Sequence, residues 1–402
     1  MNPKKMIFAS DSFKGSLSQE QILNILEEAA REQFPDCECI GIPIADGGEG
    51  TARAVTGAAG GKLRKVKVHD PLMKKHEAIY GLLPRHRAII EMAEASGLPL
   101  VPASKRDPRN TSSYGTGELI LDALQQGCRD IRIAIGGSAV DDGGMGAFRA
   151  MGFQFFDKDG EELEGFGKDL IRVASNSAAN VPPEVRGASF TVMCDVDNPL
   201  LGPDGATYVF GPQKGGTPEI LKELEAGMEN YAAVVAKITG EHYENFGGTG
   251  AAGGLGFSAA AFLRAKIRSG IETILDLVGF DEMLRDTNLC ITGEGRLDDQ
   301  SMHGKAIHGV AKHCKKEGVP CIAIVGGTKE GYDRIYLQGV TGVYVTTPDG
   351  MPLEEAMAHA EELYRKSAEK VFDDIAKDVI HGGEYYCVLN SCPAWAQLRT
   401  DL

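Results

Sequence analysis

Strand-like and helix-like patterns of apolar residues alternate at both ends of the chain. A short apolar run over 5–10 is followed by a polar turn and then by apolar positions at helical spacing over 22–30, which predicts a strand and a helix. The apolar run over 37–44 predicts a second strand, and the pattern over 52–60 predicts a second helix. This βαβα order favours a parallel sheet.

The pattern changes near residue 62. The runs over 62–83 and 87–98 are typical of antiparallel strands with turn residues between them. Further along, helices are expected near 218–239 and 255–268. From about 272 to 377 the alternation of strand and helix patterns returns and supplies three more strands. The middle of the chain is therefore a mixed α/β segment between two segments with βα rhythm.

The two outer segments predict a single domain. Their two N-terminal and three C-terminal strands fit a doubly wound, flavodoxin-like α/β domain with a parallel sheet, formed by residues 1–65 and 271–380. Residues 66–270 would form a second, inserted mixed α/β domain. Residues 381–402 show no clear period, and we expect them to be a peripheral C-terminal tail.

Composition and charge narrow the class of partner. The net charge of −15 argues against a nucleic acid or an anionic membrane surface as partner. No apolar run approaches the length of a membrane span, and the N-terminus lacks a signal-peptide pattern. The nine cysteines are scattered, odd in number and without a CxxC pair, so we expect reduced thiols, a cytoplasmic location and no zinc site.

Polar loops follow the predicted strands of the outer domain. In an open parallel sheet, ligands bind beyond the carboxyl ends of the strands where the strand order reverses, here between the first and third strands. These strands end in the loops SDSFKGS (10–16) and TGEGRLDDQSMHGK (292–305). The two loops carry the candidates Asp11, Ser12, Lys14, Ser16, Glu294, Arg296, Asp298 and Lys305, and the loop after the second strand adds Asp46 and Glu49.

The glycine-lysine pair at 304–305 does not complete a P-loop. That motif needs a glycine five positions before Gly304 and a hydroxyl residue after the lysine, whereas Asp299 and Ala306 stand there. Each polar loop alone is also compatible with a helix cap or a turn. Their shared position at strand ends favours a phosphate-handling site.

Two acidic loops lie in the middle segment. The stretch GGSAVDDGGMG (136–146) is either a simple connection between strand and helix or, through its paired carboxylates, a ligand loop. Asp195 and Asp197 fit a magnesium ligand, a general base or a solvated acidic loop. Lys214 either lies in a plain turn or reaches a ligand. The nine histidines show no metal-ligand spacing.

Seven motifs occur in the order that is found in the type 1 glycerate kinases. They are DSFKGSLS, PIADGGEGT, YGTGELI, GGSA, CDVDNPLLGPDGAT, GAAGGLG and TGEGRLD, and the resemblance runs from about Met6 to Ile380. The pair Val140-Asp141 departs from the Thr-Asn that is common in relatives, so a hydroxyl contact at position 140 is lost. The C-terminal tail is not typical either.

The resemblance implies an enzyme that uses ATP and Mg²⁺ to phosphorylate D-glycerate. In bacterial relatives the product is usually 2-phosphoglycerate rather than 3-phosphoglycerate. The resemblance also implies the flavodoxin-like domain with an inserted α/β domain. A homo-oligomeric state is compatible with the sequence.

The same resemblance implies roles for the loop residues. Lys14, Arg296 and Lys305 would act on the anionic substrates. The general base would be Asp46 or Asp195. Asp197 and Asp298 would hold magnesium. Further contacts to substrate or nucleotide would come from Asp11, Ser12, Ser16, Gly47, Gly48, Glu49, Gly136, Gly137, Ser138, Asp142, Gly293, Glu294 and Gly295.

Two other functions stay open at the level of sequence. A non-catalytic regulatory protein could bind a sugar acid or a nucleotide, but it would not need the cations and acids to stand together. A dehydrogenase would need a GxGxxG turn directly after the first strand, and SDSFKGS does not supply one. The sequence decides neither which hydroxyl of glycerate is phosphorylated nor which carboxylate is the base.

Overall fold

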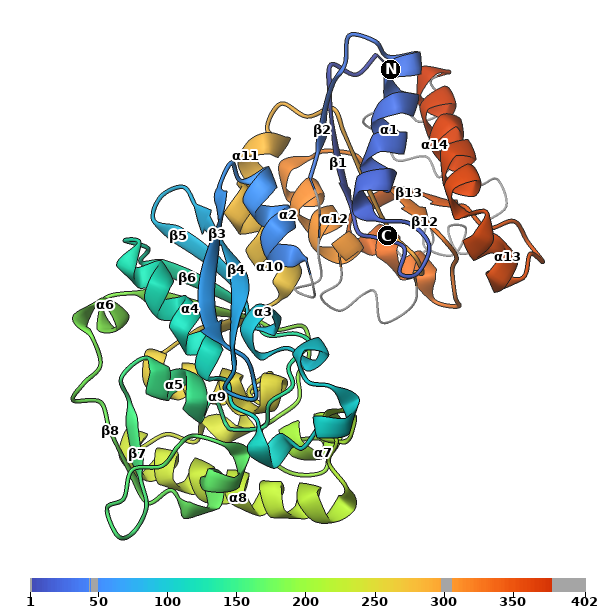
Figure 1. The fold of residues 1–402 in the computed structure, drawn as a ribbon. Coiled ribbons are helices and arrows are strands. Elements are labelled where there is room, and N and C mark those ends of the chain that lie inside the picture. Colours follow the sequence, from blue (N-terminus) through green and yellow to red (C-terminus); the bar gives the residue numbers. More distant parts are fainter. Residues whose placement is uncertain (1, 43, 45–49, 298–305, 378–402) are drawn as a thin grey trace, which may run out of the picture. The chain divides into compact units, whose positions relative to one another are not determined.

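The chain forms two compact units (Figure 1). The structure is a computed structural model that describes residues 2–42, 44, 50–297 and 306–377. Unit 1 comprises Met1–Asp46 and Ile271–Leu402, and unit 2 comprises Gly47–Gly270. Each unit is built around its own main β-sheet.

Unit 1 contains a parallel sheet in the order β13-β12-β11-β1-β2. Counted within this unit from the β2 edge, the order is 2-1-3-4-5, which is flavodoxin-like. Because β1 pairs in parallel with β11, the prediction that both ends of the chain share one sheet is confirmed. The strands are β1 (Lys5–Ser10), β2 (Glu38–Gly41), β11 (Leu289–Glu294), β12 (Cys321–Val325) and β13 (Val340–Val345).

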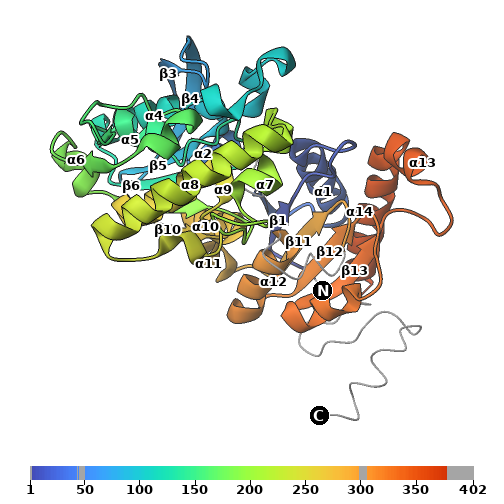
Figure 2. The ribbon, with the colours of Figure 1, turned by 90° about the horizontal axis from the view of Figure 1, so that it is seen from below.

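Helices cover both faces of the unit 1 sheet (Figure 2). On one face pack α1 (Gln19–Gln33) and α14 (Ala360–Ala376), where the rings of Phe8 and Phe372 have centroids 6.1 Å apart. On the other face α12 (Ala306–Glu317) contacts β11 and β12. This double coverage explains why β11 and β12 are buried along their whole length and have apolar sequences.

Two helical stretches predicted as continuous are interrupted. The stretch expected over 272–285 is α10 (Gly270–Val278) followed by α11 (Phe280–Leu284), because Gly279 adopts a φ of 75° between them. The stretch expected over 353–377 is α13 (Leu353–Ala358) followed by α14, with His359 between them. The helix expected near 330 is a 3₁₀ helix, η8 (Tyr332–Gln338).

Unit 2 contains a mixed sheet in the order β10-β9-β6-β5-β4-β3. The first three strands along the chain pair in antiparallel fashion, as the alternating pattern predicts, and the remaining pairs are parallel. The strands are β3 (Lys62–His69), β4 (Lys75–Leu83), β5 (Arg87–Glu91), β6 (Asp130–Ala134), β9 (Ser189–Met193) and β10 (Lys266–Arg268). A separate small sheet joins β7 (Gln154–Phe156) and β8 (Ser175–Ser177).

The helices of unit 2 include one whose end was predicted wrongly. The helix expected over 255–268 ends at Leu263, because Arg264 adopts a left-handed φ of 52° and the chain then enters β10. Its start agrees with the prediction, because the positive φ angles of residues 252–254 place a kink directly before Leu255. The helices are α2 (Thr51–Ala58), α3 (Ala93–Ser96), α4 (Tyr114–Gln125), α5 (Met145–Ala150), α6 (Pro183–Arg186), α7 (Ala206–Phe210), α8 (Pro218–Thr239) and α9 (Ala251–Leu263). No helix of the described ranges in either unit is both long and apolar enough to cross a membrane.

The first boundary between the units differs from the one expected at residues 65 and 66. Helix α2 packs on β4 and β5. Glu91, the last residue of β5, accepts hydrogen bonds from the backbone N–H groups of Gly50 (3.1 Å) and Ala52 at the start of this helix. These contacts place α2 in unit 2, and a cut after residue 65 would pass through β3, which pairs with β4 over its whole length.

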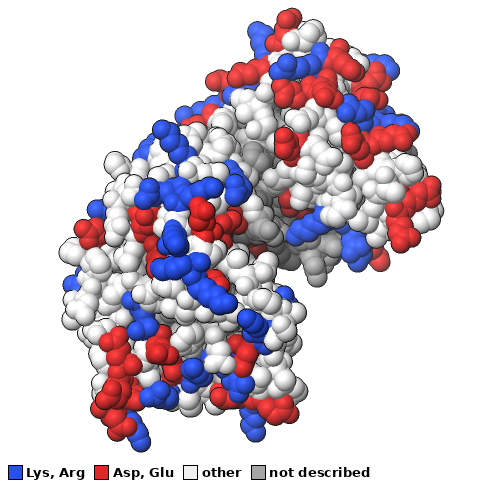
Figure 3. Space-filling model, in the orientation of Figure 1, with Lys and Arg blue, Asp and Glu red and all other residues white. Residues whose placement is uncertain are grey.

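The edge strand β3 of the unit 2 sheet is protected by charge. Its exposed residues include Lys62, Lys65 and Lys67, and Figure 3 shows basic side chains gathered over β3 and β4. Lysine side chains on an edge strand oppose its pairing with a strand of another chain. The positive charge of this strand therefore has a structural explanation that needs no anionic ligand.

Gly293 allows close packing in the centre of the unit 1 sheet. A Cβ atom added there would lie 2.2 Å from the carbonyl oxygen of Ile324 on β12. Gly295, just beyond the strand, has its nearest atom at an ordinary 3.5 Å, the Cα of Phe13. Gly293 is therefore required by the sheet itself, whereas Gly295 is not.

We expect Gly293→Ala to lower the free energy of unfolding by about 2 kcal/mol, as overpacking of a filled core does. The matched control Gly295→Ala should be neutral or slightly stabilising, because it meets no close atom and reduces the freedom of the unfolded chain. Urea unfolding followed by circular dichroism measures both. Equal stability of the two variants would refute the close-packing explanation.

Candidate active site

The loop after β1 is closed by its own backbone. Phe13 and Leu17 exchange backbone hydrogen bonds of 2.9 and 3.0 Å, and both side chains are buried. Between them Gly15 adopts a φ of 82°, which favours glycine, and Lys14 is exposed. The ring of Phe13 also packs edge-on against Tyr364 at 5.3 Å. Two buried anchors thus hold Lys14 at the tip of a tight loop.

The polar side chains of this loop partly stabilise the loop itself. Oδ1 of Asp11 accepts a hydrogen bond from the backbone N–H of Ser12 at 2.6 Å. The hydroxyl of Ser16 donates to the carbonyl of Phe13 at 3.2 Å. Each of these side chains is only half-buried, so the loop geometry is compatible with additional ligand contacts.

The loop after β11 is anchored in a similar way. Leu297 is buried; its backbone N–H donates to the carbonyl of Gly327 at 2.9 Å, and its carbonyl accepts from Lys329 at 3.0 Å. Arg296, directly before this anchor, is exposed, whereas Glu294 at the end of β11 is buried.

The two loops of unit 1 lie next to each other, as the strand order predicts. The backbone N–H of Asp11 donates to the carbonyl of Gly293 at 2.9 Å. Gly295 lies against the backbone of Phe13 and Lys14. The exposed cations Lys14 and Arg296 therefore belong to neighbouring loops at the carboxyl edge of one parallel sheet.

Gln19 is a residue of this region that sequence reasoning missed. It is the first residue of α1, and its side-chain amide donates to Oδ1 of Asp11 at 3.3 Å and to the carbonyl of Ile44. The amide thereby links the loop after β1 to the chain segment that follows β2. A polar residue directly after a capping serine is the only sequence signal, and it is a weak one.

Six sequence-predicted candidates lie outside the described residues. They are Asp46, Gly47, Gly48, Glu49, Asp298 and Lys305. Their roles stay predictions.

In unit 2 the loop after β6 exposes two glycines that the sequence analysis assigns as contacts to substrate or nucleotide. Gly136 and Gly137 are exposed, and Gly137 adopts a φ of 74° while its carbonyl accepts from the backbone N–H of Leu98 at 2.9 Å. Ser138, the next residue, is largely buried and its backbone bridges to Gly97. Gly136 and Gly137 therefore present open backbone, whereas Ser138 is mainly part of the interior.

Asp142 has a structural environment that differs from the expected ligand contact. Its carboxylate is fully buried and accepts four hydrogen bonds, from the N–H (2.7 Å) and hydroxyl (2.8 Å) of Ser113 and from the N–H groups of Gly144 (3.0 Å) and Gly146 (3.2 Å). Burial raises the pKa of this carboxyl to about 6, against the opposing effect of these donors. Asp142 ties together the starts of α4 and α5, so we assign it a structural role.

The neighbouring Val140 and Asp141 also belong to the interior. Both are fully buried, and the Nζ of Lys214 donates to the carbonyl of Val140 at 2.6 Å. Burial lowers the pKa of Lys214 while the negative charges of Asp141 and Asp142 oppose that shift. Burial likewise raises the pKa of Asp141 against the effect of Lys214. Lys214, left open by the sequence, is therefore a buried partner of this loop.

The acidic loop after β9 is exposed. Oδ1 of Asp195 accepts a hydrogen bond from the backbone N–H of Gly270, the first residue of α10, at 2.8 Å. A carboxylate at this position stabilises a helix N-terminus. Asp197 is exposed beside Gly247. Among the described residues neither aspartate belongs to a group of three or more side chains close enough to hold a metal ion.

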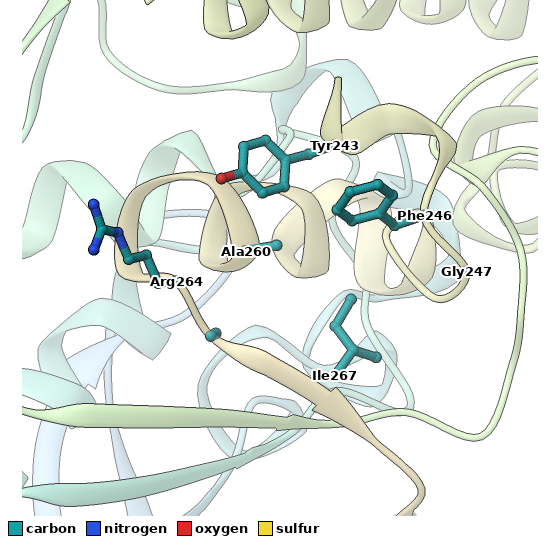
Figure 4. A pocket seen from close by; sticks show the side chains of 7 residues that line it. Tyr243, Phe246, Gly247, Ala260, Arg264 and Ile267 are labelled. Carbon is teal, nitrogen blue, oxygen red and sulfur yellow. The ribbon is translucent and has the colours of Figure 1, made fainter. Parts of the chain in front are cut away.

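An aromatic pocket of about 320 Å³ borders the same part of unit 2 (Figure 4). The rings of Tyr243 and Phe246, 5.5 Å apart in an edge-on arrangement, lie on one side and Ile267 lies on the other. Its volume is at the lower end of the range for ligand pockets, about 300–1,000 Å³. The sequence contains no periodic signal for it. Its lining is Tyr243, Phe246, Gly247, Ala260, Arg264, Ala265 and Ile267.

We expect Asp142→Ala to lower the free energy of unfolding by about 3 kcal/mol, because three buried N–H groups lose their acceptor. Asp159→Ala, at an exposed position of the same unit, is the control and should change stability little. Urea unfolding and steady-state kinetics on both proteins separate the roles. Unchanged stability combined with a raised KM would instead make Asp142 a ligand contact.

Comparisons with known proteins agree with this architecture. A family model described as the glycerate kinase family matches residues 6–376. A glycerate kinase of Halalkalibacterium halodurans is 41% identical over 91% of this chain and 97% of its own length. A glycerate 2-kinase of Escherichia coli is 39% identical over 94% of this chain and 100% of its own length.

A solved structure extends the comparison to three dimensions. A chain from Salmonella typhimurium LT2, described as a glycerate kinase 2, superposes with a TM-score of 0.83 at 39% identity, covering 94% of this chain and 100% of that one. Both the family match and the relatives span nearly the whole chain. The chain therefore belongs to the glycerate kinase family.

Proposed function

We propose that this protein is a kinase that transfers the γ-phosphoryl group of ATP to D-glycerate in the presence of Mg²⁺, with 2-phosphoglycerate as product. The observation that supports this most directly is the pair of neighbouring loops after β1 and β11, which carry the exposed cations Lys14 and Arg296. They stand where the strand order of the sheet reverses, the usual ligand position in open α/β sheets. Membership of the glycerate kinase family supplies the substrate class.

The cations at this edge of the sheet matter because the substrates and the chain as a whole are negatively charged. The chain carries a net charge of −15, and both glycerate and ATP are anions. Phosphoryl transfer depends mainly on positioning and on stabilising negative charge, so the site needs local cations. In this proposal Arg296 binds a carboxylate or phosphate through two parallel hydrogen bonds, whereas Lys14 and Lys305 act as point charges on the transferring oxygens.

The general base in this proposal is Asp46 or Asp195. Asp195 already accepts a hydrogen bond from the backbone N–H of Gly270. The base would remove the proton of the glycerate hydroxyl as its oxygen attacks the γ-phosphorus.

Magnesium in this proposal binds through few protein ligands. Mg²⁺ in such enzymes is typically held by one or two carboxylates together with waters and the phosphates of the nucleotide. Asp197 and Asp298 are the proposed ligands, with Glu294 as a further contact. Since the phosphates and waters complete the coordination, a preformed cluster of acids is not required.

Backbone amides would contribute the remaining phosphate contacts. Gly136 and Gly137 present exposed backbone in unit 2. In unit 1 Gly295 is half-buried and would contribute its backbone N–H. Gly47 and Gly48, with Glu49 beside them, keep the roles implied by their motif. We do not propose a phosphate contact for Gly293, because this residue is required for packing between β11 and β12.

A coupled assay of ADP formation with D-glycerate and ATP tests the proposal. We expect turnover that ceases on chelation of divalent ions and returns with Mg²⁺. Phosphorus NMR of the product then identifies the ester, because phosphate on C2 couples to a single proton and phosphate on C3 to two. Binding of D-glycerate without any ADP formation would favour the regulatory alternative. A 3-phosphoglycerate spectrum would overturn only the choice of hydroxyl.

Substitutions separate the roles of the cations. Lys305→Ala should lower kcat by roughly a hundredfold, about 3 kcal/mol, if this lysine stabilises the transition state. Arg296→Lys should instead raise KM for D-glycerate or ATP by about tenfold, because an ammonium cannot form the two-pronged contact. Lys366→Ala, on the exposed side of α14, is the control. A folded Lys305→Ala enzyme with normal kcat would move the catalytic assignment to Lys14.

A further inference from the structure

Three cysteine side chains meet inside unit 1. Cys290 of β11 and Cys321 of β12 are direct partners in the parallel ladder. Their chain neighbours Ile291 and Ile322 belong to the core that packs on α1 and α14, so the two cysteines point to the opposite face of the sheet. Helix α12 covers that face and contributes Cys314.

The three sulfur atoms are close enough to share one ligand. All of them lie within 4.8 Å of one another, and all three side chains are fully buried free thiols. A central point therefore lies at most about 2.8 Å from each sulfur, compared with a metal–thiolate bond of about 2.3 Å. A contraction of about half an ångström per sulfur would complete the bonds.

The number and type of these ligands select a class of ion. Within the described part of the chain the group has only these three members, and no fourth histidine, cysteine or carboxylate joins it. Structural zinc sites are almost always tetrahedral with four protein ligands. Soft thiolate ligands without a fourth donor suit Cu(I) better. We propose that Cys290, Cys314 and Cys321 form a three-sulfur binding site for Cu(I).

Binding at this site involves proton release and no redox change. Each thiol that binds as a thiolate gives its proton to solvent, and copper stays in the Cu(I) state. The ion would enter when α12 opens locally from the sheet.

Copper binding by a second pair of thiols must be distinguished from binding at this site. Cys37 and Cys39, at the start of β2, are half-buried and their side chains interact. This pair can offer only two sulfurs. Cys387 and Cys392 lie outside the described residues and are replaced by serine in every protein used for the test.

The test is an anaerobic titration of the reduced full-length protein with Cu(I) against a chromophoric Cu(I) chelator. The Cys37→Ser/Cys39→Ser control should retain one tightly bound Cu(I) per chain. Cys314→Ala, introduced into this control, should weaken the binding by about a hundredfold or more, since even outer-shell partners of a metal contribute about 10- to 100-fold. Circular dichroism verifies that both variants are folded.

X-ray absorption on the Cys37→Ser/Cys39→Ser control counts the sulfur ligands and does not depend on whether the Cys314→Ala variant folds. Three sulfurs per copper support the site. Two sulfurs per copper in this control would overturn the three-sulfur site. Loss of tight binding in this control would also overturn it and assign Cu(I) to Cys37 and Cys39. Equal affinity of the control and a folded Cys314→Ala would also overturn it and leave the three thiols as core packing. None of these outcomes bears on the proposed kinase activity.

Discussion

The hydrogen-bond ladder between β1 and β11 is the constraint on which the described part of unit 1 depends. At its amino end Oδ1 of Asn288 accepts from the backbone N–H groups of Lys4 (2.8 Å) and Lys5 (3.0 Å). At its carboxyl end the N–H of Asp11 donates to Gly293. This ladder joins chain segments separated by the whole of unit 2, and it brings the two cation-bearing loops to one edge of the sheet.

Unit 2 relies on a different interaction, which it repeats. Carboxylates at or after the ends of its parallel strands accept hydrogen bonds from helix N-termini: Glu91 for α2, Asp142 for α4 and α5, and Asp195 for α10. A helix N-terminus is a ready anion site, and kinases often place phosphate there. In unit 2 Glu91, Asp142 and Asp195 fill these positions, so each of these three carboxylates stabilises the start of a helix.

Sequence reasoning succeeded where the signal is local and repeated. The parallel sheet follows from the βα rhythm, and α8 has the predicted bounds because Thr217 caps its start and the left-handed Gly240 follows its end. It failed where the decisive partner is distant. Nothing in the DD pair indicates that Asp142 accepts from Ser113, and an arginine at 264 does not signal a left-handed helix end. The three clustered cysteines come from separate elements, so no spacing rule finds them.

The interrupted arrangement of unit 1 has a consequence for synthesis on the ribosome. β1 and β2 emerge first, but β11, the neighbour of β1, is made only after all of unit 2. At about 5–20 residues per second this delay is on the order of 10–50 s. The edge of the apolar β1 that pairs with β11 must therefore wait while unit 2 is synthesised. Exposed strand edges of this kind favour aggregation, so the nascent chain is a natural client for a chaperone.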